Sequence, residues 1–356
     1  MRILIVKLSS IGDVVHALPT LDAIRRALPH AEISWVVERR AAEILQDNSS
    51  LDRLIEVDTK ALRRASRLGE TLLVARQQLR RLRAQPFDVA LDLQGLIKSA
   101  LLTRLAGAER RCGFAREALR EPASRFLLTE TYRVPARAHV IARNLALAAQ
   151  ALAINVPTDP EEYRFPITIA PEHEREATSL VAATGDRFAI LNPGGGWPTK
   201  LWSAERFGEL ADALWRRLAL PSIITYGPGE VELAQRAANA CRTGAVRIAS
   251  PSLKGFYALA RRASIYVGGD TGPTHLAVAA GAPVVGLFGP TEWWRNGSPR
   301  VADICVERTD IGCRENCHRR SCDRWVCMEI ATDRVLHAVE ARLQRAPRTE
   351  ARASRP

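Results

Sequence analysis

The chain alternates between short runs of apolar, largely β-branched residues and longer segments whose apolar residues recur at helical spacing. In the first half, the β-rich runs occupy residues 3–6, 33–37, 54–57 and 89–93, and residues 14–28 illustrate the helical spacing. Alternation of this kind is typical of α/β domains built on a parallel sheet. The sequence therefore predicts a doubly wound α/β fold.

The alternation restarts after a proline-rich segment. Residues 155–171 contain four prolines and have the composition of a linker. Further β-rich runs follow at residues 189–191, 222–226, 246–248, 265–267 and 284–288. A chain of 356 residues also exceeds what one hydrophobic core usually supports. We therefore predict two domains, at residues 1–165 and 166–345, and a disordered tail at residues 346–356, which lacks large apolar side chains.

The charge balance favours an anionic partner. The sequence has 51 Lys and Arg against 39 Asp and Glu, a formal net charge of +12. Residues 60–83 contain eight basic residues and one acid, with leucines at helical spacing, which predicts an amphipathic basic helix or helix pair. A solvated helix face, a dock for an anionic lipid surface and a nucleic-acid site remain open. The absence of interleaved aromatic residues argues against single-stranded nucleic acid.

Membrane and cysteine patterns indicate the compartment. The first apolar run is cut by Lys7 and is too short for a signal peptide, and the near-apolar stretch at residues 276–288 is too short to span a bilayer. An odd number of cysteines, seven, fits reduced thiols, so we expect a cytoplasmic protein. Four cysteines near the C-terminus have spacings looser than those of structural zinc sites, so a reduced loop and a zinc site both remain open. They are Cys313, Cys317, Cys322 and Cys327.

A small-residue turn follows the first predicted strand and enters a helix. It contains Ser10, Gly12 and Asp13. In doubly wound folds, ligands bind at this edge, where the amide groups of the helix start point outward. Asp13 is therefore either a ligand-facing carboxylate or a helix-capping acid.

Two further turns follow strands of the second half. Gly194, Gly195 and Gly196 let the backbone approach a ligand closely, and Lys200 can supply a charge to phosphate. Glu230, after the next strand, can accept from a ribose diol. The alternative for the glycine turn is a flexible loop in which Lys200 is solvated. The alternative for Glu230 is an ordinary acidic residue at a helix start.

The motif at residues 268–276 combines glycines with threonine hydroxyls at a helix start, which fits a diphosphate. A capped turn with Thr274 at the N-cap is the alternative. The sequence contains no Asp-x-Asp pair, the usual carboxylate arrangement for a metal bridging a nucleotide diphosphate. We therefore expect a site without metal or cofactor, in which Lys200 and the helix start neutralise a leaving group.

In combination, these motifs resemble those of the lipopolysaccharide heptosyltransferases, glycosyltransferase family 9, and most of all its heptosyltransferase I branch. The matching segments are residues 7–16, 92–99, 120–122 and 270–275, and the similarity extends from residue 1 to about residue 345. The resemblance implies the GT-B architecture, two Rossmann-like domains facing a central cleft. It also implies transfer of L-glycero-D-manno-heptose from ADP-heptose to Kdo-lipid A, with inversion at the anomeric carbon.

The resemblance assigns the acceptor to the N-terminal domain and the donor to the C-terminal domain, with Asp13 as general base. The implied donor-binding residues are Gly195, Gly196, Lys200, Glu230, Asp270, Thr271, Gly272 and His275. The expected acceptor-binding residues are Ser10, Gly12, Arg63, Arg64, Arg67, Lys98 and Arg120. The expected partners are ADP-heptose, Kdo-lipid A and the cytoplasmic surface of the inner membrane, contacted peripherally, without nucleic acid.

Two departures from the heptosyltransferase I pattern leave alternatives open. Three glycines stand at residues 194–196, where hydroxyl side chains are expected, so the backbone would supply those donor contacts. The cysteine-rich C-terminal loop is more typical of other branches, so heptosyltransferase II or another family 9 sugar transferase remains open. In other classes, a non-catalytic nucleotide-sugar-binding protein and a basic nucleic-acid-binding protein remain alternatives.

Overall fold

The computed structural model describes residues 1–59, 76–182, 184–314, 317 and 319–345. The chain divides into two compact units, unit 1 (Met1–Thr168) and unit 2 (Ile169–Pro356). The division falls inside the proline-rich segment. The expected tail at residues 346–356 and residues 60–75 of the basic segment lie outside the described residues, whereas residues 76–82 are helical.

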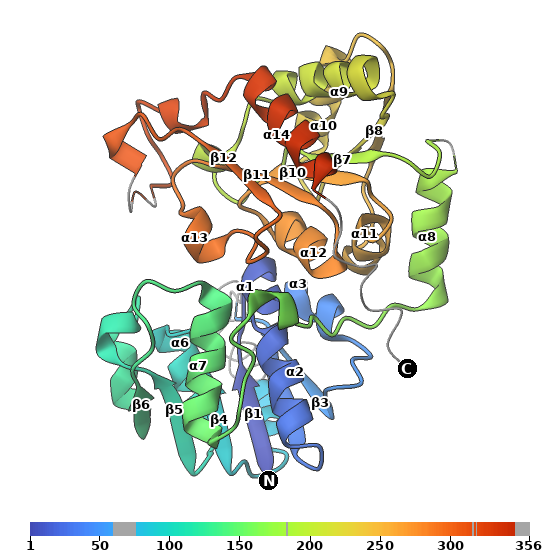
Figure 1. Ribbon diagram of the computed structural model, residues 1–356. Helices are drawn as coiled ribbons and strands as arrows, with labels where there is room; N and C mark the ends of the chain where they lie inside the picture. Colours follow the sequence, from blue (N-terminus) through green and yellow to red (C-terminus); the bar gives the residue numbers. More distant parts are fainter. Residues whose placement is uncertain (60–75, 183, 315–316, 318, 346–356) are drawn as a thin grey trace. The chain divides into compact units, whose positions relative to one another are not determined.

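Unit 1 contains a six-stranded sheet in the order β3-β2-β1-β4-β5-β6, and each recorded pairing is parallel (Figure 1). The strands are β1 (Arg2–Val6), β2 (Glu32–Glu38), β3 (Arg53–Val57), β4 (Val89–Asp92), β5 (Arg110–Phe114) and β6 (Glu130–Tyr132). This is the strand order of the dinucleotide-binding doubly wound fold. The switch point lies between β1 and β4, so the loops that leave these two strands are the expected ligand-binding positions.

Short helices connect these strands. They are α1 (Ile11–Val15), α2 (Leu18–Ala27), α3 (Arg39–Ala42), α6 (Ile97–Leu105) and α7 (Val140–Leu152), with 3-10 turns η1 (Glu43–Leu45), η2 (Arg116–Ala118), η3 (Pro122–Leu127) and η4 (Pro160–Glu162). Residues 14–28, whose apolar residues recur at helical spacing, are divided between two helices, because α1 ends at Val15 and α2 begins at Leu18. Pro19 explains the break, since it lacks an N–H and its ring would clash with the carbonyl of Val15 in a continuous helix.

Unit 2 repeats the same topology in the order β12-β11-β10-β7-β8-β9, again with parallel pairings. Its strands are β7 (Ala189–Asn192), β8 (Ser222–Thr225), β9 (Val246–Ala249), β10 (Ile265–Gly269), β11 (Val284–Phe288) and β12 (Ile304–Glu307). Its helices are α8 (Pro171–Val181), α9 (Ala204–Leu218), α10 (Val231–Ala240), α11 (Leu253–Ala260), α12 (Gly272–Ala280), α13 (Trp293–Asn296) and α14 (Thr332–Gln344), with 3-10 turns η5 (Pro198–Lys200), η6 (Gly312–Arg314) and η7 (Val326–Met328). The switch point here lies between β7 and β10.

Each sheet carries helices on both faces, so its central strands are almost entirely buried (Figure 1). This arrangement explains why their sequences are continuous apolar runs rather than alternating patterns. The core of unit 1 gathers side chains such as Leu4, Val36 and Ala90, and that of unit 2 gathers Leu191, Phe207 and Val267. The predicted α/β fold with two parallel sheets is confirmed. Among the described residues, no helix combines the length and the apolar character needed to cross a membrane.

Candidate functional site

Asp13 lies in α1, directly after the loop that leaves β1. Its Oδ2 accepts hydrogen bonds from the backbone N–H of Ser10 at 2.7 Å and from the Ser10 hydroxyl at 3.0 Å. Its Oδ1 lies 3.8 Å from Nζ of Lys7. Asp13 therefore caps the helix start, as one interpretation predicted, yet its side chain keeps 39% of its surface exposed. The held oxygen fixes the carboxylate while the group stays accessible to a substrate.

The loop between β1 and α1, just before Asp13, is held by the segment that follows β4. The side-chain oxygen of Gln94 accepts from the N–H groups of Leu8 and Ser9 at 3.0 and 3.3 Å. The buried ammonium of Lys7 donates to the carbonyl of Leu93 at 2.7 Å. The candidate base thus follows a loop that is tied down across the switch point of the sheet.

Asp92, at the end of β4, organises the other side of this connection. It accepts from the N–H groups of Gln94 at 2.9 Å and Gly95 at 3.1 Å, and from the Ser99 hydroxyl at 3.0 Å. Burial raises the pKa of Asp92 to about 6, although these hydrogen bonds and the charge of Lys7 oppose the rise. The sequence motif at residues 92–99 therefore fixes the backbone of the loop between β4 and α6 through the hydrogen bonds of Asp92.

Four of the seven expected acceptor residues lie in the part of the chain that the structure describes. Ser10 and Arg120 are exposed, Gly12 is buried in α1, and Lys98 on α6 places Nζ 3.5 Å from Oε1 of Glu38. Lys98 and the loop of Ser10 follow β4 and β1, which are neighbours in the sheet. The other three expected residues, Arg63, Arg64 and Arg67, lie outside the described residues.

In unit 2, Lys200, Asp270 and His275 form a largely buried polar cluster. Nζ of Lys200 lies 2.6 Å from Oδ2 of Asp270, and Nε2 of His275 lies 3.3 Å from its Oδ1. Burial opposes ionisation, but the hydrogen bond from His275 and the charge of Lys200 hold the pKa of Asp270 below its usual range. An ammonium has three N–H donors, and Lys200 directs two at Asp270 Oδ2 and its carbonyl oxygen. No hydrogen-bond acceptor for the third is recorded among the described residues.

The helix α12 begins beside this cluster. Its N-cap is Thr271, so the alternative with Thr274 at the N-cap is wrong. The buried hydroxyl of Thr274 instead donates to the carbonyl of Gly269 and bonds the hydroxyl of Tyr266 at 2.9 Å. These contacts fasten the first helical turn to β10. The amide groups of a helix start favour an anion, so the backbone around Gly272 is suited to bind one beside the Lys200–Asp270 pair.

Glu230 connects two glycine turns of unit 2. Its Oε1 accepts from the N–H of Gly195 at 3.0 Å and its Oε2 accepts from the N–H of Gly227 at 2.9 Å. A Cβ at Gly194 would collide with the carboxylate, so a larger residue there would displace Glu230 from this position. Gly196 is exposed and leaves room around its backbone. The carboxylate thus has a defined position at the end of β8, with lone pairs left for a ligand hydroxyl.

The sequence did not reveal a group of contacts from the C-terminal loop. Nζ of Lys200 lies 4.3 Å from the ring centroid of Trp197, and Cζ of Arg320 lies 5.2 Å from the same ring. The indole N–H of Trp325 donates to the carbonyl of Thr199 at 2.8 Å. The sequence shows only that Trp197 stands three residues before Lys200. It does not show the contacts with Arg320 and Trp325, because these residues follow more than one hundred positions later.

All seven cysteines are free thiols. Burial raises the pKa of Cys327, and the charges of Cys317, Cys313 and Cys322 raise it further. Within the described ranges, no three His, Cys, Asp or Glu side chains are arranged to hold a metal ion. The zinc interpretation therefore receives no support from this part of the chain.

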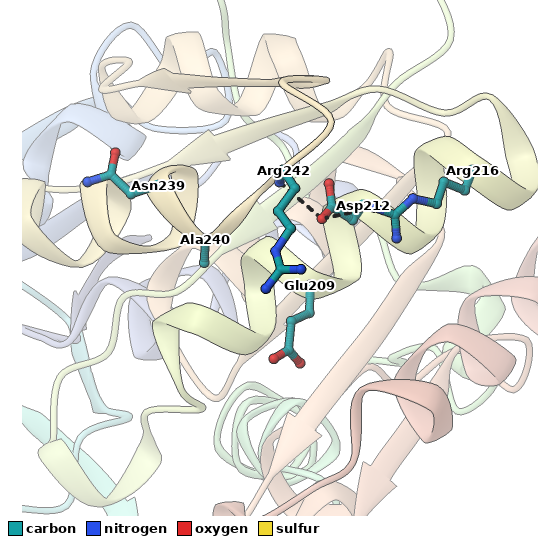
Figure 2. A pocket seen from close by; sticks show the side chains of 6 residues that line it. All are labelled: Glu209, Asp212, Arg216, Asn239, Ala240 and Arg242. Carbon is teal, nitrogen blue, oxygen red and sulfur yellow. Dashed lines mark hydrogen bonds and ion pairs between the residues drawn. The ribbon is translucent and has the colours of Figure 1, made fainter.

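Unit 2 also has a hollow of about 530 Å³ that shares no residue with these groups, and Figure 2 shows the residues that line it. It lies between α9 and the end of α10. Its buried acid, Asp212, accepts from the N–H groups of Arg242 at 3.0 Å and Thr243 at 2.8 Å and is 3.6 Å from Arg216. Asp212 thus anchors the turn after α10, which is a structural role.

Comparison with known proteins identifies the family. Residues 75–324 match the model of glycosyltransferase family 9 (heptosyltransferase). Lipopolysaccharide heptosyltransferase 1 of Pseudomonas aeruginosa is 34% identical over 82% of this chain and 79% of its own length. E. coli heptosyltransferase WaaC, solved with ADP, has a TM-score of 0.79 at 26% identity and covers 96% of this chain and 100% of its own. The same enzyme with ADP-2-deoxy-2-fluoro heptose has a TM-score of 0.72 at 28% identity, covering 86% of this chain and 93% of its own.

The confirmed fold, with its two parallel-sheet α/β units, is that of GT-B glycosyltransferases such as WaaC. Together, the family match and the curated relative show that this chain belongs to glycosyltransferase family 9, the heptosyltransferases.

Proposed function

We propose that this chain transfers L-glycero-D-manno-heptose from ADP-heptose to Kdo-lipid A, with inversion at the anomeric carbon and with Asp13 as general base. The observation that carries the donor side is the cluster of Lys200, Asp270 and His275 at the start of α12. It places a cation and a helix N-terminus at the carboxyl end of one sheet, where a nucleoside diphosphate binds in doubly wound folds.

The donor is held by three kinds of contact in this proposal. Lys200 and the backbone around Thr271 and Gly272 bind the diphosphate, and the backbone N–H of Gly196 adds a donor, while the N–H of Gly195 holds Glu230. Glu230 accepts from the ribose diol. His275 and Asp270 keep Lys200 in place: the ionised carboxylate pairs with the ammonium, and the imidazole hydrogen-bonds its other oxygen. That E. coli WaaC was solved with ADP supports a nucleotide of this kind.

The chemical step needs a base for the acceptor hydroxyl. In the proposed reaction, Asp13 takes the hydroxyl proton while the oxygen attacks the anomeric carbon. The new bond joins that oxygen to the sugar, and the bond between the sugar and the β-phosphate oxygen breaks. ADP leaves with the electron pair, and Lys200 and the helix start stabilise its developing charge. No metal ion is required, because these groups already supply positive charge.

The acceptor is a phosphorylated sugar on a lipid, so cationic residues of unit 1 bind it in this proposal. These are Lys98 and Arg120 together with Arg63, Arg64 and Arg67 of the basic segment. Ser10 and Gly12 line the approach to Asp13. The same basic segment, residues 60–83, holds the chain peripherally at the cytoplasmic face of the inner membrane.

Product analysis tests this function and its alternatives. The purified chain is incubated with ADP-heptose and either Kdo-lipid A or the same acceptor that already carries one heptose, and the lipid is examined by mass spectrometry. The proposal predicts addition of one heptosyl residue to Kdo-lipid A. Addition only to the heptosylated acceptor would assign the chain to the heptosyltransferase II reaction. ADP binding without turnover on any acceptor would indicate a sensor.

A further inference from the structure

Unit 1 carries large apolar side chains on its surface outside the candidate site. On α6, Ile97 and Leu101 are 46% and 44% exposed and stand one helical turn apart on the same face. Phe126, in η3, is 72% exposed, and η3 packs against α6. We call these three residues the apolar patch. Single exposed apolar residues are ordinary, but three on two packed elements form a surface.

Cations accompany the apolar patch. Arg104 is the next exposed position along the face of α6 that carries Ile97 and Leu101. Arg125 is exposed, with Cζ 4.5 Å from the ring centroid of Phe126. Neither arginine forms an ion pair with any residue that the structure describes. Their charges are therefore available to an anionic partner.

The acids of the same region are already engaged. Glu121 accepts from the backbone N–H of Ile97 at 2.7 Å, and Glu117 pairs with Arg133 at 3.4 Å. The region is thus apolar at its centre, with Arg104 and Arg125 beside it and the carboxylate of Glu121 at the start of α6. This combination matches the boundary of an anionic bilayer, where apolar side chains enter the acyl region and arginines contact phosphates.

The position in the fold fits a substrate that is part sugar and part lipid. α6 begins after the β4 loop in which Gln94 holds the backbone of Leu8 and Ser9, next to Asp13. If the sugar of a lipid-linked acceptor lies at Asp13, the apolar patch on the adjoining helix α6 is then the surface that faces the acyl chains of that lipid or of the surrounding bilayer.

We propose that Ile97, Leu101 and Phe126, with Arg104 and Arg125, form the surface through which unit 1 contacts an anionic lipid bilayer. The inference rests on the proposed function for its purpose, since it brings a membrane-bound acceptor to Asp13. It is separate from the basic segment at residues 60–83. The contact itself needs neither donor nor turnover, so it can be measured independently.

The test is sedimentation of the full chain with phosphatidylcholine vesicles, with and without phosphatidylglycerol. The variant Ile97→Ser/Leu101→Ser/Phe126→Ser is expected to weaken partitioning by about tenfold or more. Phe126→Ser alone, whose ring is mostly outside the fold, should weaken it by about threefold. Arg104→Gln/Arg125→Gln should reduce binding only to vesicles that contain phosphatidylglycerol.

A matched control replaces three exposed aliphatic residues of unit 2, Val231→Ser/Ile248→Ser/Val301→Ser. It should retain vesicle binding. Unchanged binding of the folded triple variant of the apolar patch, or of Phe126→Ser if the triple variant does not fold, would overturn the proposal. So would a dimer in solution that the patch variant converts to a monomer, because the patch would then bind a second copy.

An acceptor without acyl chains separates this inference from the proposed function. The patch variant should keep the wild-type kcat/KM on that acceptor while its KM for vesicle-bound Kdo-lipid A rises. If the wild-type protein binds vesicles through the patch but transfers heptose to neither acceptor, the proposed function fails and the membrane surface stands.

Discussion

Replacing Asp92 by Asn should stabilise the protein at neutral pH, although it removes a charge next to the buried Lys7. The asparagine oxygen can accept from the N–H groups of Gln94 and Gly95, and its amide can donate to the Ser99 hydroxyl. Asp92→Asn therefore keeps the hydrogen bonds that hold the loop and removes the burial cost of a carboxylate.

The magnitude follows from the pKa of the buried carboxyl. Burial raises the pKa of Asp92 from 3.8 to about 6, so the unfolded chain loses this proton at lower pH than the folded chain. The wild-type free energy of unfolding therefore falls as pH rises from about 4 to about 6, by about 3 kcal/mol from this group. Asparagine does not titrate, so the free energy of unfolding of Asp92→Asn should rise relative to that of wild type by about 3 kcal/mol between pH 4 and pH 6.

Urea unfolding of both proteins at a series of pH values measures this difference. Asp212→Asn provides a control of opposite sign, because the hydrogen bonds from Arg242 and Thr243 outweigh burial and lower the pKa of Asp212 to about 2. That variant should lose stability relative to wild type as pH rises from about 2 to about 4. A difference for Asp92→Asn that is independent of pH, or that moves against Asn, would refute the account of this loop.

Three further outcomes test the substrate contacts. Lys200→Ala should raise the donor KM and lower kcat, because the ammonium interacts with the diphosphate both in the ground state and in the transition state, and Lys200→Arg should be less affected. Unchanged steady-state kinetics would show that Lys200 only pairs with Asp270 and does not bind the donor. Arg63→Gln/Arg64→Gln/Arg67→Gln should weaken binding to anionic vesicles by about 1 kcal/mol per charge at low salt, and undiminished sedimentation with vesicles would remove these arginines from the membrane contact. Turnover should persist in excess EDTA, and a loss that Mg²⁺ restores would contradict a metal-independent reaction.

The sequence predicted the central strands well because their burial on both faces leaves continuous apolar runs, as in β1 and β10. It missed β5, β6 and β12. β5 begins with Arg110 and Arg111, and its neighbour β6 has three residues. Arg110 pairs with Glu130 of β6 at 2.8 Å, so a cross-strand ion pair takes the place of an apolar contact. Charged residues at these positions leave no alternation of apolar and polar residues from which a strand could be predicted.

The same distinction explains which parts of the site were predictable. Asp13, Lys200, Glu230 and Asp270 stand in the connections that follow β1, β7, β8 and β10, and parallel-sheet topology puts such connections at one edge of each sheet. The contacts that hold these loops join distant segments. Lys7, for example, bonds a carbonyl 86 residues away, and that partner depends on the order of strands in the sheet.

The most direct test of the central claim compares wild type with Asp13→Asn in heptose transfer. Both proteins are incubated with ADP-heptose and Kdo-lipid A, the product is quantified by mass spectrometry, and ADP affinity and melting temperature are measured in parallel. Loss of the base predicts a rate about 10²- to 10⁴-fold lower, with ADP affinity retained because the donor groups lie in unit 2. A rate within about threefold of wild type would contradict the claim, since general-base catalysis would then reside elsewhere.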